Sequence, residues 1–415
     1  MSKVDYEHLK TLLCRIGSYG KDDPKVPLLQ RGYKSGISRT FGSIAAADAG
    51  CELKKMFEEC GMKSYVDGAG NVHGIFLSGQ PNAKEIVVAS HYDTVVHGGL
   101  YDGLLGVVSG TEAAKAIEKN LNQGWAYDLH VIATNGEEGN ELGGTFGSRA
   151  MMGMLPLESK EWLQKAQEYG YTKEKLKSAI LDSTRIACYL ELHIEQGPTL
   201  FNRGQKIGVV TGIVGLRRYR VTVSGRSNHS GTTMMEDRDD ALVKAARLIA
   251  EANDLAVEIG HNLVETVSVM DVFPGANAVI PGKVEYTMEI RDEDKAVMDL
   301  FMRKFMDLSK KYKEIAVEPI VAKDPVKCDK KLQQLIADIC EKKEISYRHM
   351  SSGATHDGNA MASKLPIAMI FVPSRNGVSH CKEEWTEWED CCLGTEILYE
   401  TIFELMSRPG ILTEK

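Results

Sequence analysis

Four short apolar runs that stop at polar residues most limit how this chain can fold. The runs cover residues 85–90, 128–134, 188–192 and 366–373, and the polar residues that follow them include His91, Glu137, His193 and His380. Long helical segments separate the runs, so the pattern predicts an α/β sheet of buried strands. Ligands of such sheets gather at the carboxyl ends of the strands, where these side chains could converge.

The middle of the chain has a different pattern, in which apolar and polar residues alternate within each strand. Its elements are expected in the order strand, helix, strand, strand, helix, strand, at residues 218–223, 239–259, 264–272, 283–291, 294–311 and 315–321. This order predicts a smaller antiparallel α+β domain of the ferredoxin-like kind. We place it at 213–327, inserted into a larger domain formed by 1–212 and 328–415, with hinges near Gly212 and Asp324.

Composition excludes several classes of function. The chain has 415 residues and a net charge of −8, whereas nucleic-acid or membrane-surface binding usually needs a basic face. No apolar run approaches the roughly 18 residues that span a bilayer. The N-terminal segment reads as an amphipathic helix, not as a signal peptide. Nine cysteines without a CxxC pair indicate free thiols in a reducing cytoplasm.

The polar residues at the strand ends are of the types that bind divalent metals. His91 can offer a neutral ring nitrogen, Asp93 can accept the other ring N–H, and Asp102 follows in a glycine-rich turn. Glu137 and Glu138 are adjacent, so one can bind metal while the other handles a proton. Any one of these residues is more often structural or surface charge than functional. Their occurrence at four separate strand ends is what indicates a two-metal hydrolase site.

Six segments resemble the hydantoinase/carbamoylase branch of the M20 metallopeptidase superfamily. They are HYDTVVHGGLYDG, NGEEG, ELHIEQGP, GRSNHSGTTMMEDRDDA, the THDG of SSGATHDG, and FVPSRNGVSH. The resemblance covers nearly the whole chain in order. It implies a mixed-sheet α/β/α di-metal hydrolase domain with an inserted lid and dimerisation domain. This branch includes N-carbamoyl-L-amino acid hydrolases, allantoate amidohydrolases and β-ureidopropionases.

The resemblance also implies the role of each residue in metal binding. One ion would be held by His91, Asp102 and His193, and the other by Asp102, Glu138 and His380, so that Asp102 bridges them. Glu137 would be the general base that activates the attacking water. We also count Asp93 among the catalytic residues, because it is expected to accept the ring N–H of His91 and fix its tautomer. Zinc, manganese, cobalt and nickel all suit such ligands.

Five further residues would contact the substrate by resemblance. Gln196 and His356 would meet the carbamoyl or amide group, while Asn277 and Arg291 would bind the substrate carboxylate. His229 would stabilise the oxyanion in the site of a partner subunit, which implies a homodimer. Taken alone, His229 reads as a turn histidine. Arg291 alone reads as a surface ion pair with Asp292 or Asp294.

The resemblance leaves the substrate open. Asn140–Thr145 interrupts the spacing usual after the two glutamates, Thr355 replaces a common glycine, and Leu216 replaces a common glutamine. We expect cleavage of the carbamoyl C–N bond of an N-carbamoyl-L-amino acid or a ureido acid such as allantoate, with release of ammonia and CO2. The alternatives are an M20-type dipeptidase or N-acyl amino acid deacylase, and a metal-binding protein without activity. His193 favours the first reading, because related peptidases usually carry an acidic residue there.

Overall fold

The structure is a computed structural model that describes residues 3–29, 35–119, 125–408 and 410–413. The chain divides into two compact units, Met1–Thr211 with Lys327–Lys415, and Gly212–Val326. We call them the large unit and the inserted unit. Among the described residues, no helix is both long and apolar enough to cross a membrane.

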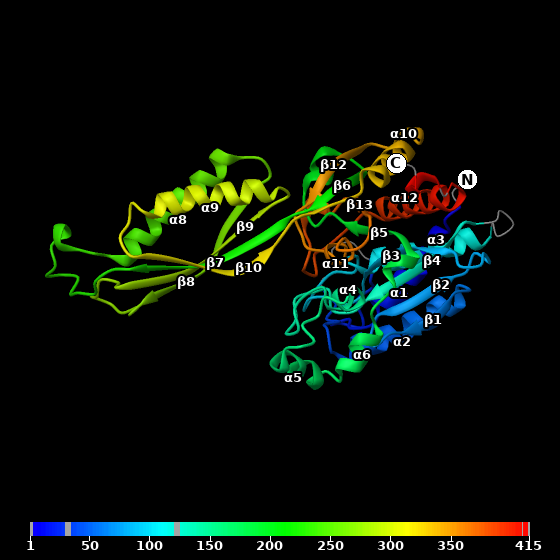
Figure 1. The fold of residues 1–415 in the computed structure, drawn as a ribbon, viewed down its shortest axis with the longest axis horizontal. Coiled ribbons are helices and arrows are strands. Elements are labelled where there is room, and N and C mark those ends of the chain that lie inside the picture. The colour runs from blue at the N-terminus through cyan, green and yellow to red at the C-terminus, as the bar shows by residue number, and fades with distance from the viewer. Residues whose placement is uncertain (1–2, 30–34, 120–124, 409, 414–415) are drawn as a thin grey trace. The chain divides into compact units, whose positions relative to one another are not determined.

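The large unit is built on a nine-stranded mixed sheet with the order β1-β2-β4-β3-β5-β13-β6-β11, in which β12 also pairs with β6 (Figure 1). Its strands are β1 (Lys63–Val66), β2 (Val72–Phe76), β3 (Lys84–His91), β4 (Tyr127–Thr134), β5 (Ile186–Ile194), β6 (Ile207–Ile213), β11 (Val326–Lys327), β12 (Tyr347–Ser352) and β13 (Ile367–Val372). The four neighbours β4, β3, β5 and β13 run parallel, so their carboxyl ends lie at one edge. They correspond to the four apolar runs, and the predicted α/β fold is confirmed.

The helices of the large unit are α1 (Tyr6–Gly17), α2 (Ile44–Glu59), α3 (Leu104–Glu118), α4 (Phe146–Met151), α5 (Lys160–Glu168), α6 (Lys173–Ser178), α7 (Thr199–Arg203), α10 (Lys330–Lys342), α11 (Gly358–Met361), α12 (Trp388–Ser407) and α13 (Gly410–Thr413). Three-residue 3-10 turns lie at η2 (Ser183–Arg185) and η4 (Arg375–Gly377). The main core joins α1, α2, α3, α10 and α12 to one face of the sheet. A smaller core forms between Ala69 and residues 142–179, around α4, α5 and α6.

Side chains alternate between the two faces of the central strands. On β5, Leu190 and Leu192 join the main core, whereas Glu191 and His193 point to the opposite face. The same alternation places Val88 of β3 in the core and His91 on the opposite face. The sheet therefore separates a packed apolar layer from a layer that carries chemistry.

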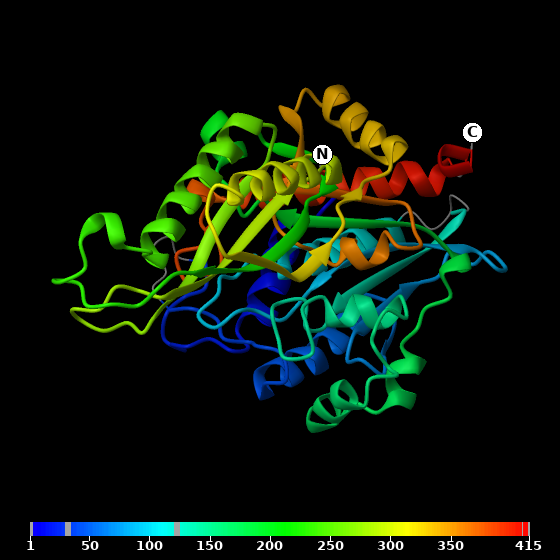
Figure 2. The same cartoon turned by 60° about the vertical axis from the view of Figure 1, so that its left-hand side comes forward.

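The inserted unit has a four-stranded antiparallel sheet of order β10-β7-β9-β8. Its elements are β7 (Gly215–Ser224), η3 (Met235–Asp237), α8 (Ala241–Ile259), β8 (Val264–Phe273), β9 (Lys283–Asp292), α9 (Lys295–Ser309) and β10 (Ile315–Lys323). Asp240 caps α8 by accepting hydrogen bonds from the backbone N–H groups of Leu242 and Val243. Both helices pack with the sheet into one core and lie along one of its faces (Figures 1 and 2).

Candidate active site

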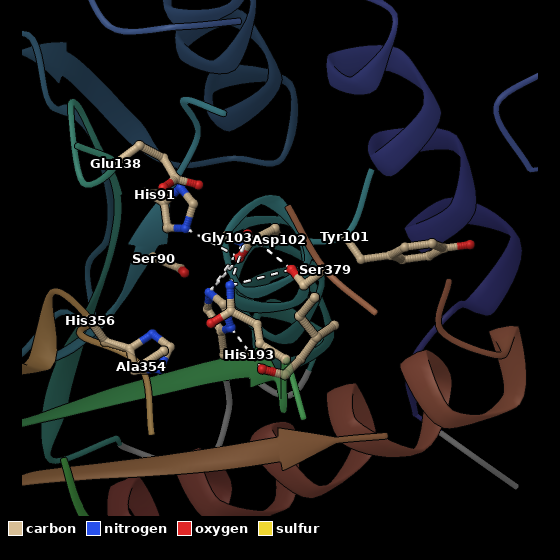
Figure 3. A network of polar contacts seen from close by, with 12 residues as sticks. Ser90, His91, Tyr101, Asp102, Gly103, Glu138, His193, Ala354, His356 and Ser379 are labelled. Carbon is tan, nitrogen blue, oxygen red and sulfur yellow. Dashed lines mark hydrogen bonds and ion pairs between the residues drawn. The ribbon is translucent and has the colours of Figure 1, made fainter. Parts of the chain in front are cut away.

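Asp102 lies at the centre of a cluster of polar side chains in the large unit, all of them buried except His380 (Figure 3). Its Oδ1 is 3.6 Å from His91 Nε2 and 3.2 Å from His193 Nε2. Its Oδ2 is 3.2 Å from His380 Nε2, which is 3.4 Å from Glu138 Oε1. Four residues thus meet around the Asp102 carboxylate, and each of its two oxygens faces different imidazoles.

The backbone around Asp102 is shaped by a glycine. Gly103 has a φ of +66°, which favours glycine, and it precedes helix α3. A Cβ at this position would lie 2.4 Å from ring atoms of His91. Gly103 therefore lets the turn and the imidazole approach each other, which sets the distance between His91 and Asp102.

The electrostatics of the cluster favour a bound cation. Burial raises the pKa of Asp102, but the imidazoles of His193, His380 and His91 outweigh this effect and hold the pKa well below its usual range. Asp102 Oδ1 is buried and accepts no hydrogen bond from the described residues. An ionised, buried carboxylate oxygen without a donor needs a positive charge beside it.

Two groups of three residues around Asp102 have the donor atoms of a divalent metal site. They are His91, Asp102 and His193, and Asp102, Glu138 and His380; within each group the donor atoms lie within 4.8 Å of one another. Imidazole nitrogens and carboxylate oxygens are common ligands of zinc and manganese. The donor set fits a divalent metal at each group.

Protons compete with cations for two of these residues. Burial, with the nearby Asp102, raises the pKa of Glu138 to about 7. The hydrogen bond to Asp102 raises the pKa of His380 to about 9. Both groups bind protons more tightly than usual, Glu138 mainly because it is buried and His380 mainly because it faces Asp102. A cation at the site would displace these protons.

Asp93 makes a different contact from the one that the sequence predicts. His91 Nδ1 donates to the backbone oxygen of Asp93 at 3.0 Å, and the Asp93 carboxylate is farther away, at 3.8 Å. That carboxylate instead accepts hydrogen bonds from three backbone N–H groups, those of Gly136, Glu137 and Glu138, at 3.0, 3.1 and 3.2 Å. Asp93 therefore anchors the loop that carries both glutamates.

Glu137 lies beside the cluster, and with His91 and Glu138 it forms a further group of potential ligands. Burial raises the pKa of Glu137 well above its usual range, and Asp357 and Glu138 add to the shift. A carboxylate with increased proton affinity is suited to accept a proton at neutral pH.

The structure places two of the predicted substrate-binding residues at the cluster. Gln196 Nε2 donates to Asp102 Oδ2 at 3.0 Å and lies 3.2 Å from His380 Nε2. His356 is buried with its ring 4.5 Å from that of His193, and its Nε2 lies 2.9 Å from Ser352 Oγ. Desolvation holds the pKa of His356 well below its usual range, so this imidazole is neutral.

The other predicted substrate-binding residues lie at opposite ends of the inserted unit. His229 forms a β-bridge with Val279, so its loop lies beside the loop that carries Asn277. Both loops extend beyond the Lys283 end of β9, whereas Arg291 is near the other end. Eight residues of strand separate Lys283 from Arg291, which corresponds to about 27 Å. Arg291 Nε donates to Glu289 Oε1 at 2.8 Å.

Sequence reasoning missed two buried acids near the cluster. Glu191 accepts hydrogen bonds from Ser90, Tyr189 and Gly358, and burial raises its pKa to about 7. Its position two residues before His193 in an apolar strand was a usable signal, because residues i and i+2 share a face. Glu384 accepts a hydrogen bond from the backbone N–H of Asp102. No sequence signal pointed to it, because the charged segment CKEEW around it is typical of an exposed loop.

Comparisons with known proteins identify the family of the chain. The model of peptidase family M20/M25/M40 matches residues 87–404. An N-carbamoyl-L-amino acid amidohydrolase of Geobacillus stearothermophilus is 32% identical, over 97% of this chain and 99% of that protein. An allantoate amidohydrolase of Bacillus subtilis (strain 168) is also 32% identical, over 89% and 93%.

A solved structure has the same fold over nearly the whole chain. It is an amidase of the hydantoinase/carbamoylase family from Burkholderia multivorans, with a TM-score of 0.85 and 28% identity over 97% of this chain and 98% of that chain. The resemblance found in the sequence motifs is confirmed. The chain belongs to peptidase family M20/M25/M40, a family of metal-dependent hydrolases.

Proposed function

We propose that this protein is an amidohydrolase with two divalent metal ions that cleaves the carbamoyl C–N bond of a small carboxylate substrate. The substrate would be an N-carbamoyl-L-amino acid or a related ureido acid such as allantoate, and the products would include ammonia and CO2. The observation that carries the proposal is the meeting of His91, Glu138, His193 and His380 around Asp102. The substrates named for the relatives support the substrate class.

Asp102 would bridge the two ions, because its two oxygens face different imidazoles. His91 and His193 would complete the site at Oδ1, and Glu138 and His380 the site at Oδ2. Zinc or manganese suits this ligand set, and cobalt and nickel also fit. A pair of such ions polarises the bond to be cleaved and makes water a stronger acid.

Glu137 would act as the general base. The three hydrogen bonds to Asp93 fix the backbone of its loop, and burial raises its proton affinity. Its carboxylate would take a proton from the attacking water and return it to the leaving nitrogen. Gln196 and neutral His356 would contact the carbamoyl group beside this base.

Substrate binding would use residues from two subunits. Asn277 and Arg291 lie at opposite ends of β9 and its adjoining loop. They are too far apart for both residues of one chain to contact the same small carboxylate. We infer that Arg291 binds the substrate carboxylate, and that Asn277 and His229 reach the site of the partner subunit. His229 would donate a hydrogen bond to the developing oxyanion.

The edge of the inserted sheet supports a homodimer. β8 is an edge strand, and its side chains Val264, Val269, Met270 and Phe273 are 40 to 56% exposed. An exposed apolar edge strand is a template for pairing with a second chain. The inserted unit would therefore serve both dimerisation and substrate binding.

The substrate class is tested with metal-reconstituted protein and pairs of carbamoyl and acyl derivatives of the same amino acids, together with allantoate. We expect ammonia release from one or more ureido compounds and little hydrolysis of the acyl forms. Faster hydrolysis of acyl or dipeptide substrates would assign the protein to the peptidase side of the family. No hydrolysis of any compound by protein that holds two ions would contradict an enzymatic role.

A mixing experiment tests the shared site. Glu137→Gln removes the base of its own large unit, and His229→Ala removes the oxyanion donor of its inserted unit. In a mixed dimer, one site combines an intact Glu137 with an intact His229 of the partner, so mixing two inactive variants should restore about a quarter of wild-type activity. Activity that stays at the level of the separate variants would show that each subunit works alone.

A further inference from the structure

Glu384 joins the loop that carries Asp102 to the loop that carries His380. It lies four residues after His380 and is only 4% exposed. Its Oε1 accepts hydrogen bonds from the backbone N–H groups of Tyr101, at 2.9 Å, and Asp102, at 3.1 Å. Its Oε2 accepts a hydrogen bond from Ser379 Oγ at 2.8 Å. Glu384 thus binds the backbone of the candidate ligand Asp102 and the side chain of Ser379, which precedes the candidate ligand His380.

A close approach at Gly99 shows that the fit is tight. A Cβ at this position would lie 2.0 Å from Glu384 Oε1, so residue 99 must be glycine while Glu384 keeps its position. The two loops also meet next to this contact, where the rings of Tyr101 and Trp385 pack edge to face with their centroids 5.8 Å apart. The contact is therefore a packed junction between two loops.

The junction bears on the geometry of a bridging ligand. Asp102 Oδ2 contacts Gln196 Nε2 at 3.0 Å and Ser379 Oγ at 3.4 Å. The carboxylate can keep both contacts only while the backbone at residue 102 stays in place. His380 reaches the same oxygen from the other loop. A shift between the loops would change the distance between Asp102 and His380, and outer partners of metal ligands commonly alter metal affinity 10- to 100-fold.

We propose that Glu384 is a positioning residue that sets the separation of Asp102 and His380 and thereby the affinity for the ion that they share. The proposal rests on the proposed metal site. Glu384 itself is not a ligand in it: both of its oxygens are occupied by the N–H and O–H donors described above.

The test measures metal content against increasing concentrations of a competing chelator, with zinc as the probe, together with the melting temperature of metal-free protein. Glu384→Ala should weaken binding of one ion by about 10- to 100-fold. Glu384→Gln keeps an oxygen for the two N–H groups and should stay within a few-fold of wild type. Rescue by glutamine would show that the contact with the Asp102 loop matters, and not mere space filling.

Asp128→Ala is the matched control. Asp128 is 7% exposed, and its Oδ1 accepts hydrogen bonds from the N–H and the hydroxyl of Ser78, so it resembles Glu384 in burial and in donors but lies at the start of β4. The Asp128→Ala substitution should lower the melting temperature of metal-free protein without changing its metal affinity. Equal losses of affinity in the two alanine variants would overturn the proposal.

Gly99→Ala provides a second route if Glu384→Ala fails to fold, because the added methyl group collides with the Glu384 carboxylate. It should weaken binding of the same ion about 10-fold or more. If wild-type protein binds two ions and Gly99→Ala binds zinc with unchanged affinity, the role proposed for Glu384 is wrong while the metal site stands. Wild-type protein that binds no zinc would instead contradict the proposed metal site.

Discussion

The two units of this chain use β-strands in opposite ways. All eight residues of β4 in the large unit are buried, and the strand ends directly before the loop that carries Glu137 and Glu138. In the inserted unit, most residues of β8 are exposed, and the candidate substrate-binding residues lie in loops and near the end of β9. Under the proposed function, the buried strands would fix the reacting groups, while the half-exposed sheet would provide surfaces for substrate recognition and assembly.

The largest expected effect comes from the centre of the large unit. Asp102→Asn should abolish hydrolysis and lower metal content from two ions towards one or none, since this carboxylate faces both ligand groups. Elemental analysis and ammonia release are the measurements. Asp128→Asn, which alters a buried carboxylate outside the cluster, should keep both ions and most of the activity. Two ions in Asp102→Asn would contradict the bridging role.

Glu137→Gln separates catalysis from metal binding within the same unit. Loss of the base should reduce kcat by about 10²- to 10⁴-fold, while KM and metal content stay close to wild type. Steady-state kinetics on the best substrate, with parallel metal analysis, check this. Unchanged kcat in protein with full metal content would remove Glu137 as the base.

A smaller effect is expected from the inserted unit. Arg291→Met removes one charge-assisted carboxylate contact, which corresponds to about a 10- to 100-fold loss in kcat/KM with metal content unchanged. Arg220→Met is the control, because Arg220 is exposed and its ion pair with Glu318 spans 3.8 Å. If Arg291→Met instead loses metal, the division of roles between the two units is wrong.

The smallest effect concerns pH and metal-free protein. Burial raises the pKa of Glu138 to about 7, and the hydrogen bond to Asp102 raises the pKa of His380 to about 9. Folded protein therefore binds these protons more tightly than unfolded protein does. Their contribution to stability is complete below the unfolded pKa values of 4.5 and 6.5, and is lost as the pH rises through 7 and 9.

We expect the melting temperature of chelator-treated protein to fall by about 2 to 4 °C between pH 6 and pH 9. Metal-loaded protein should not show this decline, because the ions replace the protons. Glu138→Gln should weaken the dependence between pH 6 and pH 8. The same decline in metal-loaded protein would place the responsible groups outside the cluster.

The strands and the meeting of their ends were predictable, because apolar runs and period-two alternation are local signals. The ligand residues followed from the family motifs, and their roles remain predictions. Contacts between distant side chains were not predictable. Glu384 and Tyr101 are 283 positions apart, and nothing in CKEEW distinguishes a buried acid from surface charge. For the same reason, the Asp93 carboxylate binds the loop at Gly136–Glu138, where the sequence suggested an imidazole.

The alternation along β5 limits how this protein can change over time. Leu190 and Leu192 point into the core, and Glu191 and His193 point to the opposite face. Insertion or deletion of one residue within the strand would exchange the two faces, and would ruin packing and chemistry in one step. Insertions and deletions are therefore expected past the strand ends, in segments such as Asn140–Thr145. New substrate preferences can arise there while the inherited reaction centre stays intact.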